Sequence, residues 1–362
     1  MPQVSFMTNW GGEAGHDFDF AGIFRTHLDQ DFPFLQMKWQ SWKTRPARHD
    51  LSIARGEVSE DAIPLDEGKL VRDGAYQIVF ENGTYEVGPA SITCSGDANE
   101  FHLDHYVITP VINRMIAKNG NYLAHASGVS IDDQVIIFPG ITGSGKTSVL
   151  LELLSRGASY VGNENIFFDR GGRCTTYDPI ISFSERNAAL FPELLGRLFP
   201  DEKERRRQER RLSFHRLGQS LEGGHFFTRW VKENILSRSN FSCDAAFDKV
   251  FPGCPTRTSG EVAYAFLLER SGAQPSILKA RSDEAAALVV ASEWARANNG
   301  GYSHNILAEL AGLKFCHKAD YQDLFADFFG KAECYRMRIP PNASRDNIRR
   351  TVDMMQDIAG RP

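Results

Sequence analysis

The pattern of apolar and polar positions divides the chain into a β-rich first part and a mixed second part. Residues 1–20 are polar and glycine-rich, which predicts a loosely held segment or an edge strand. Between residues 32 and 95, runs of aromatic and β-branched residues are broken by turn residues, which predicts a small antiparallel sheet. The runs include residues 32–42. Asn82-Gly83 separates YQIVF from TYEVG, and this dipeptide favours a tight hairpin.

A helix is predicted between the two parts. Val107, Val111, Met115 and Ile116 recur at helical spacing, and Asn119-Gly120 is typical of a helix end. We therefore expect an N-terminal β-rich domain, a bridging helix and a larger C-terminal domain, with the boundaries 1–100, 101–120 and 121–362.

The second part alternates strand and helix patterns. Residues 122–138 predict a hairpin turning at Asp132-Asp133, and a helix pattern follows and ends at Gly157. The rest of the chain predicts, in order, two strands over 158–179, polar helices over 184–240, a core strand over 261–270, helices over 283–330, a last strand, and a closing helix capped by Ser344.

Between the strand QVIIF and the following helix lies the segment 140–147, GITGSGKT, which has the form GxxxxGK[ST] of a phosphate-binding P-loop. The glycines let successive backbone N–H groups turn inward toward phosphate oxygens, and the helix adds its positive N-terminal end. Lys146 is expected to reach the β- and γ-phosphates, and Thr147 to bind Mg²⁺. The predicted nucleotide-binding residues are Gly140, Thr142, Gly143, Ser144, Gly145, Lys146, Thr147 and Ser148.

Composition and charge indicate where the protein is located and which classes of partner it has. The 362 residues are 42% hydrophobic and 24% charged, with a formal net charge of -5, so no overall positive field favours nucleic acid. The N-terminus lacks the basic and apolar regions of a signal peptide, and no apolar run approaches the roughly 20 residues that span a bilayer. The six cysteines form no CxxC pair. We expect a cytoplasmic protein without nucleic-acid or membrane partners.

The order of residues around the loop resembles the catalytic domain of the HPr kinase/phosphorylase family over about residues 125–170. In that family a histidine begins the preceding strand, and an Arg-Gly pair leads through a strand to two adjacent acidic residues. The matching positions are His125, Arg156-Gly157, the strand 159–161 and Asn163-Glu164. The resemblance implies an α/β (α+β) fold with a P-loop core of the phosphoenolpyruvate-carboxykinase type, beside the smaller, mainly antiparallel N-terminal domain. It also implies ATP, Mg²⁺ and a hydroxyl acceptor.

One position departs from the family pattern. Asn163 stands where the family keeps the carboxylate that serves as general base and acid, and an amide cannot accept a proton from an attacking hydroxyl. Glu164 keeps a carboxylate that can hold Mg²⁺. Three interpretations stay open: Glu164 serves as both metal ligand and base, His125 is the base or stabilises the transition state, or phosphoryl transfer here needs little base assistance. The departure argues against phosphorylase activity.

Several further residues have two interpretations each. Asp178 and Glu185 are either a second carboxylate for Mg²⁺ or solvated strand ends. The basic run 203–211 is either a solvated helix or loop, or an anion-binding segment in which Arg205 to Arg207 contact phosphate. Arg257 is either a phosphate ligand or an exposed loop residue.

The sequence thus predicts an ATP- and Mg²⁺-dependent kinase. The acceptor is a hydroxyl, either of a serine in a peptide or protein or of a small molecule. The β-rich part is expected to build either the acceptor site or a homo-oligomer contact. The alternative, favoured by Asn163, is a regulatory nucleotide-binding protein with reduced catalysis.

Overall fold

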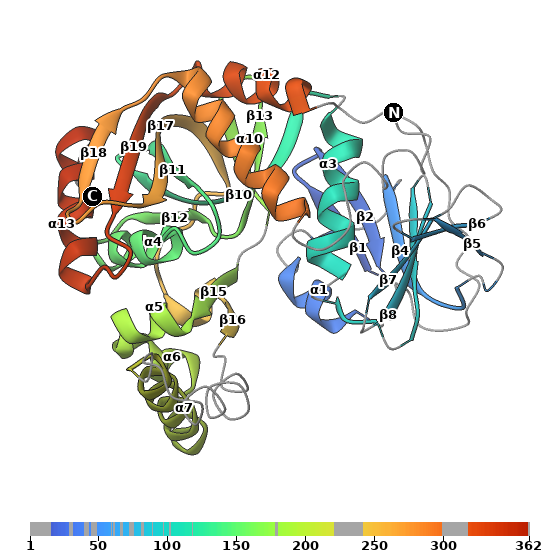
Figure 1. The fold of residues 1–362 in the computed structure, drawn as a ribbon, viewed down its shortest axis with the longest axis horizontal. Coiled ribbons are helices and arrows are strands. Elements are labelled where there is room, and N and C mark those ends of the chain that lie inside the picture. The colour runs from blue at the N-terminus through green and yellow to red at the C-terminus, as the bar shows by residue number, and fades with distance from the viewer. Residues whose placement is uncertain are drawn as a thin grey trace.

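The computed structural model describes most of the chain. It covers residues 16–28, 32–39, 43–44, 49–58, 60, 62–65, 68–71, 76–80, 83–88, 90–96, 98–100, 103–117, 119–177, 180–220, 242–298 and 318–360. In Figure 1 a sheet built from the first hundred residues lies on one side of the molecule, and a second sheet with its covering helices lies on the other. The fold is therefore a mixed α/β arrangement with several sheets.

The N-terminal sheet has nine strands in the order β3-β1-β2-β4-β9-β8-β7-β6-β5. These strands are β1 (His16–Phe20), β2 (Phe24–Leu28), β3 (Lys43–Thr44), β4 (Leu51–Arg55), β5 (Ala62–Leu65), β6 (Gly68–Val71), β7 (Tyr76–Phe80), β8 (Gly83–Val87) and β9 (Ser91–Cys94). The predicted hairpin is confirmed, because β7 and β8 pair antiparallel from Phe80↔Gly83; the turn residues 81–82 lie outside the described part. The expected small antiparallel sheet is instead large and mixed, since β4 pairs parallel with both β2 and β9.

The prediction of a strand within residues 32–42 is wrong, because this segment contains helix α1 (Pro33–Lys38). Proline at the first helical position is compatible with a helix start. Phe32, Leu35 and Trp39 are fully buried and stand at helical rather than alternating spacing. The aromatic content suggested a strand, but burial of one helical face decides the structure.

A helix is present in the segment where one was predicted: a π-helical turn η2 (Leu103–Ile108) continues into α3 (Thr109–Ala117). The Asn113 side chain exchanges two hydrogen bonds with the backbone of Leu123, which fixes α3 to the first strand of the second sheet. The core of the N-terminal sheet continues across this boundary, because Phe20 packs on Phe167 and Tyr177. The two sheets therefore share buried aromatic contacts.

The second sheet has eight strands. They are β10 (Asn121–Ile131), β11 (Gln134–Pro139), β12 (Ser159–Gly162), β13 (Asn165–Asp169), β14 (Arg173–Thr176), β17 (Ser259–Arg270), β18 (Ser276–Lys279) and β19 (Glu333–Ile339). The β10–β11 hairpin is as predicted, whereas the segment 158–179, for which two strands were predicted, holds the three strands β12, β13 and β14. Because β11 pairs with both β10 and β17, the strands β11, β10, β13, β14 and β17 close into a ring.

Helices cover this sheet. They are α4 (Lys146–Ser155), α10 (Ser282–Asn298), α12 (Lys318–Phe329) and α13 (Arg345–Ala359); the predicted Ser344 cap of α13 is confirmed by a capping box. Below the sheet in Figure 1 lie α5 (Glu185–Leu190), η3 (Pro192–Leu194), α6 (Leu195–Leu198), α7 (Glu202–Ser220) and α9 (Phe247–Val250), with the strand pair β15 (Ile180–Ser184) and β16 (Ser242–Ala246). No helix among the described residues has the length and apolarity needed to cross a bilayer.

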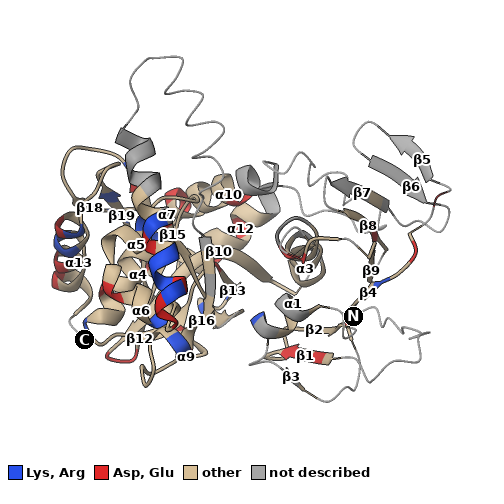
Figure 2. Cartoon of the chain, turned by 90° about the horizontal axis from the view of Figure 1, so that it is seen from below, with Lys and Arg blue, Asp and Glu red and all other residues tan. Residues whose placement is uncertain are grey.

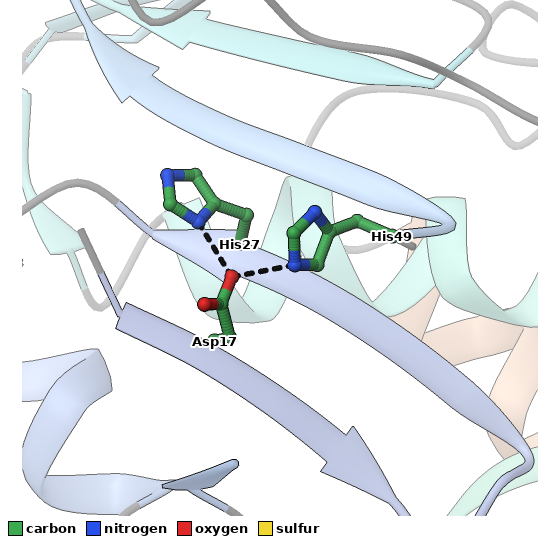
Figure 3. A group of neighbouring side chains, drawn as sticks. All are labelled: Asp17, His27 and His49. Atoms are coloured by element: carbon green, nitrogen blue, oxygen red, sulfur yellow. Dashed lines mark hydrogen bonds and ion pairs between the residues drawn. The ribbon is translucent and has the colours of Figure 1, made fainter. Parts of the chain in front are cut away.

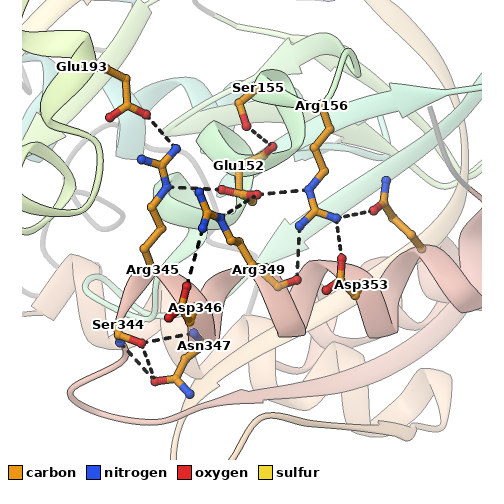
Figure 4. A network of polar contacts seen from close by, with 11 residues as sticks. Glu152, Ser155, Arg156, Glu193, Ser344, Arg345, Asp346, Asn347, Arg349 and Asp353 are labelled. Atoms are coloured by element: carbon orange, nitrogen blue, oxygen red, sulfur yellow. Dashed lines mark hydrogen bonds and ion pairs between the residues drawn. The ribbon is translucent and has the colours of Figure 1, made fainter.

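A buried carboxylate joins α4 to α13 (Figure 4). Glu152 on α4 is 4% exposed and lies 3.1 Å from Arg156 Nε, 3.7 Å from Arg345 Nε and 3.8 Å from Arg349 Nε. Arg156 also reaches Asp353 on α13. A buried carboxylate needs such compensation, so this network fixes the helix that follows the glycine-rich loop.

Candidate functional site

Three parallel strands end at one edge of the second sheet. β17 runs parallel to β11, with Ile137 opposite Ala265, and parallel to β19, with Arg270 opposite Ile339. Parallel strands present their carboxyl ends at the same edge, which is where α/β sheets commonly bind ligands. The segment 140–147 follows β11 directly, so the loop lies at this edge beside Arg270.

The loop conformation depends on its glycines. Gly143 and Gly145 have φ values of 80° and 106°, which L side chains rarely adopt. Gly140 lies against the neighbouring strand, because a Cβ there would approach Leu268 O to 2.8 Å and Ser144 Oγ to 2.9 Å. The loop therefore turns tightly over the end of β17 and delivers the chain into α4 at Lys146.

Lys146 is folded back onto the loop that precedes it. Its Nζ donates to Gly140 O at 2.8 Å and to Ile141 O at 3.0 Å, and the residue is 5% exposed. The ammonium group is thus held over the loop by neutral carbonyl oxygens. Exchanging these acceptors for phosphate oxygens would give charge-assisted hydrogen bonds, which are stronger.

The other predicted loop residues differ in their surroundings. Thr142 is exposed at the tip. Ser144 is fully buried, and its Oγ has no hydrogen-bond partner among the described residues. Ser148 is buried and its hydroxyl donates to Asn187 on α5, so this side chain joins two helices and leaves only its backbone for a ligand.

Asn163 joins three parts of the site. It follows β12, is fully buried, and its Oδ1 accepts from Ser127 Oγ on β10 at 2.8 Å and from Thr147 Oγ1 at 3.3 Å. Its Nδ2 lies 3.5 Å from Glu164 Oε1. Asn163 therefore positions the Thr147 hydroxyl and ties it to the neighbouring carboxylate.

Glu164 and His125 lie together in the structure. Glu164 has φ 71°, an uncommon conformation for a residue with a side chain, and its carboxylate Oε2 lies 3.2 Å from His125 Nδ1. His125 is 7% exposed in its side chain and Glu164 is 21% exposed, so the carboxylate faces the more open side. The backbone N–H of His125 donates to Glu293 on α10 at 2.9 Å, which holds the start of this pair in place.

Arg270 at the end of β17 is a site residue that the sequence analysis missed. Its Nε donates to Gly143 O at 3.2 Å and its Nη1 to Pro340 O at 3.0 Å, whereas its buried Nη2 has no hydrogen-bond partner among the described residues. Burial, together with the nearby charge of Arg186, lowers the pKa of Arg270 to about 10. The available signal is its position as the last residue of the predicted strand 261–270.

Arg186 on α5 extends this positive region. Its Nη2 donates to Pro341 O at 2.6 Å, and burial lowers its pKa. Within the described ranges neither Arg186 nor Arg270 forms an ion pair with a carboxylate. Two partly buried guanidinium groups without a counter-charge next to a glycine-rich loop form a local excess of positive charge, which an anion would relieve.

The remaining sequence candidates have other surroundings. Arg257 lies before β17, and its Nη1 binds the Asp133 carbonyl at 2.7 Å and carboxylate at 2.9 Å. Its charge is therefore paired at the opposite end of the strand from the loop. Asp178 lies outside the described residues, and Glu185 occupies the first turn of α5.

The basic run 203–211 is part of α7, where basic and acidic residues alternate in Figure 2. Arg205, Arg206 and Arg207 each pair with a glutamate one turn away on the same helix. Arg206 and Arg207 are about two-thirds exposed in their side chains. These features match the solvated helix among the two interpretations.

The donor set fits a nucleotide with Mg²⁺. The Thr147 hydroxyl and the Glu164 carboxylate are oxygen ligands, which Mg²⁺ prefers, and both are joined to the same asparagine. The buried, unpartnered Ser144 Oγ and Arg270 Nη2 face the same loop region and can hydrogen-bond an anion. A phosphate–magnesium site needs both nitrogen donors and oxygen ligands, and the described residues here offer both.

Comparisons with known proteins give distant likenesses among solved structures. No family model matches the chain, and no curated protein matches it. A solved structure of the HPr(Ser) kinase/phosphatase from Coxiella burnetii is 12% identical and aligns over 44% of this chain and 70% of that chain, with a TM-score of 0.23. A likeness this low establishes neither a shared family nor a shared function.

Proposed function

We propose that this protein transfers the γ-phosphate of ATP to a hydroxyl group, with Mg²⁺. The observation that carries the proposal is the position of the loop 140–147. It lies at the shared carboxyl edge of β11, β17 and β19, with Lys146 and Arg270 both bound to its carbonyl oxygens. A strand, this loop and a helix in direct succession are the context that a P-loop requires.

The phosphates of ATP would replace the carbonyl partners of the two cations. Lys146 moves from Gly140 O and Ile141 O onto the β- and γ-phosphates, a short displacement within the loop. The unpartnered Nη2 of Arg270 lies beside Gly145: a Cβ added to Gly145 would lie only 2.7 Å from this nitrogen. The start of α4 adds its positive dipole end.

Thr147 and Glu164 would hold Mg²⁺, which when bound neutralises charge on the transferred phosphoryl group. Asn163 contributes by position, since its Oδ1 orients the Thr147 hydroxyl and its Nδ2 approaches Glu164. An amide can orient both oxygen ligands without adding charge. Its role is therefore positioning rather than proton transfer.

The acceptor proton goes to Glu164 in this proposal. Its carboxylate is more exposed than Asn163 and His125, the two side chains beside it, and His125 Nδ1 lies 3.2 Å from its Oε2. His125 then orients the carboxylate and stabilises the proton that it receives. The acceptor hydroxyl belongs to a serine of a peptide or protein, or to a small molecule.

The proposal is tested by following ATP with ³¹P NMR in the presence of a serine-containing peptide pool and, separately, a mixture of small alcohols. We expect phosphate ester to form, and Lys146→Ala to lower its rate by about 10²–10³-fold, because a charge-stabilising donor is lost. Lys249→Ala on the exposed face of α9 is the matched control and should keep full turnover. Unchanged turnover in Lys146→Ala would sink the proposal.

A second candidate is a regulatory nucleotide-binding protein without catalysis. It is favoured by one observation: the fully buried Asn163 fills the position next to Thr147 with an amide that cannot accept a proton. Isothermal titration separates the candidates. ATP binding that Lys146→Ala abolishes, combined with no phosphoryl transfer to either acceptor pool, would favour the regulatory protein.

A further inference from the structure

Two histidines and an aspartate meet on the N-terminal sheet, away from the loop 140–147 (Figure 3). Asp17 lies on β1, His27 on β2 and His49 just before β4. Ten and then twenty-two positions separate them, so no motif connects them in the sequence. The fold alone brings them together.

Strand register explains the meeting. β1 and β2 pair antiparallel with Asp17 directly opposite His27. The residue after His49, Asp50, donates its backbone N–H to Arg25 O on β2 at 2.8 Å, which places His49 beside the same pair. One atom of Asp17, Oδ1, lies 2.7 Å from His27 Nδ1 and 2.5 Å from His49 Nε2.

The three side chains are largely buried but keep some contact with solvent. The exposed fractions of the side chains are 8% for Asp17, 14% for His27 and 20% for His49. Among the described residues, the two histidines are the only ion-pair partners of Asp17, and no lysine or arginine compensates its carboxylate. His27 Nε2 is buried without a hydrogen-bond partner in the same part of the chain. A buried carboxylate that two imidazoles approach at one oxygen needs a positive charge at that point.

We propose that Asp17, His27 and His49 bind one divalent transition-metal ion of the Zn²⁺ class. One ligand atom from each residue lies within 4.8 Å of the other two. Two ligand atoms of a tetrahedral zinc site lie roughly 3.3 Å apart, from Zn–N and Zn–O bonds of about 2.0–2.2 Å. The ligand atoms at 2.7 and 2.5 Å therefore need to separate by less than about 1 Å, which side-chain rotation supplies.

The ligand chemistry selects the metal. Two imidazole nitrogens and one carboxylate favour zinc and its first-row neighbours, whereas Mg²⁺ prefers oxygen ligands. Three protein ligands leave a fourth position for water, consistent with the partial exposure of both histidines. This site is thus chemically separate from the Mg²⁺ ligands proposed at Thr147 and Glu164.

The test uses the full chain, stripped with chelator and reloaded with Zn²⁺ or Co²⁺. Metal content after gel filtration is measured by mass spectrometry, and Co²⁺ is followed by its visible absorption. We expect one metal per chain in the wild type, and at least about 100-fold weaker binding in His27→Gln and His49→Gln, more than the ~10–100-fold loss for an outer-shell partner.

His16→Gln is the matched control. His16 precedes Asp17 on β1, so its side chain points to the other face of the strand, and this variant should keep the metal. Glu164→Gln should also keep it, which separates this site from the His125–Glu164 pair. Zn²⁺ should raise the melting temperature of the wild type but not of His27→Gln, a comparison that holds even if the variant is less stable. Absence of metal in the reloaded wild type, or equal loss in His16→Gln, would overturn the proposal.

Discussion

Charged side chains have different partners at the two ends of helix α4. At its C-terminal end, Glu152 and Arg156 belong to a network in which acidic and basic groups of α4 and α13 pair with one another. At its N-terminal end, Lys146 and Arg270 contact carbonyl oxygens, and the Arg270 Nη2 has no hydrogen-bond partner among the described residues. Paired charges hold the fold together, whereas a partly buried guanidinium without a carboxylate partner among the described residues fits a site for an anion.

Two glutamates, Glu152 on α4 and Glu164 after β12, make the sharpest contrast. Glu164→Gln should lower phosphoryl transfer by about 10²–10⁴-fold, because it removes the proposed proton acceptor and a Mg²⁺ ligand, with little change in stability. Glu152→Gln should do the reverse: a loss of about 2–3 kcal/mol of unfolding free energy, because three arginines lose their shared carboxylate, with turnover of the folded protein retained.

Urea unfolding and initial rates measured on both variants decide this comparison. A stability loss in Glu164→Gln equal to that in Glu152→Gln would mean that Glu164 is structural. The division between the two ends of α4 would then fail.

Replacing the arginines near the two ends of β17, Arg257 and Arg270, should give smaller shifts in melting temperature, of opposite sign. Arg270→Gln should raise the melting temperature of the free protein by about 2–4 °C, because removing a partly buried cation without a counter-charge outweighs the loss of its hydrogen bonds to two carbonyl oxygens. Arg257→Gln should lower it by a similar ~2–4 °C, because hydrogen bonds to Asp133 and Ser130 are lost. Differential scanning fluorimetry measures both, and a shift of the same sign in the two variants would contradict the assignment.

The smallest expected effect is the chemical labelling of the buried cysteines Cys174 and Cys334 at neutral pH. Burial raises the pKa of Cys174 to about 12 and that of Cys334 to about 11, so both stay as thiols at neutral pH. A raised thiol pKa lowers the thiolate fraction, and the native protein should react with iodoacetamide at these positions only above about pH 10. Peptide mapping after labelling at pH 7 and pH 10.5 checks this. Modification of either at pH 7 would show that the interior opens more readily than its packing indicates.

Local signals made part of the fold predictable. The hairpin turn Asp132-Asp133, the loop 140–147 and the Ser344 cap each depend on a few neighbouring residues, and each appears where the sequence places it. The helix within the segment 32–42 could not be predicted from neighbouring residues. It forms because one of its faces is buried in the N-terminal core. Propensity without knowledge of that core favoured a strand.

Non-local contacts account for what the sequence missed in the site. Arg257 and Arg270 border the same predicted strand, and only the parallel pairing of β11 with β17 shows that Arg270 reaches the loop. The grouping of Asp17, His27 and His49 likewise follows from strand register rather than from spacing. By contrast, the order of residues around the loop was enough to select His125, Asn163 and Glu164, whose roles stay predictions.

The most direct test of the central claim is an isothermal titration of ATP with Mg²⁺ into the wild type, Arg270→Gln and Arg257→Gln. If the edge of β11, β17 and β19 binds the triphosphate, Arg270→Gln binds ATP about 30-fold or more weakly than the wild type, and Arg257→Gln binds it equally well. Equal affinity in all three proteins, or no ATP binding by the wild type, would contradict the account.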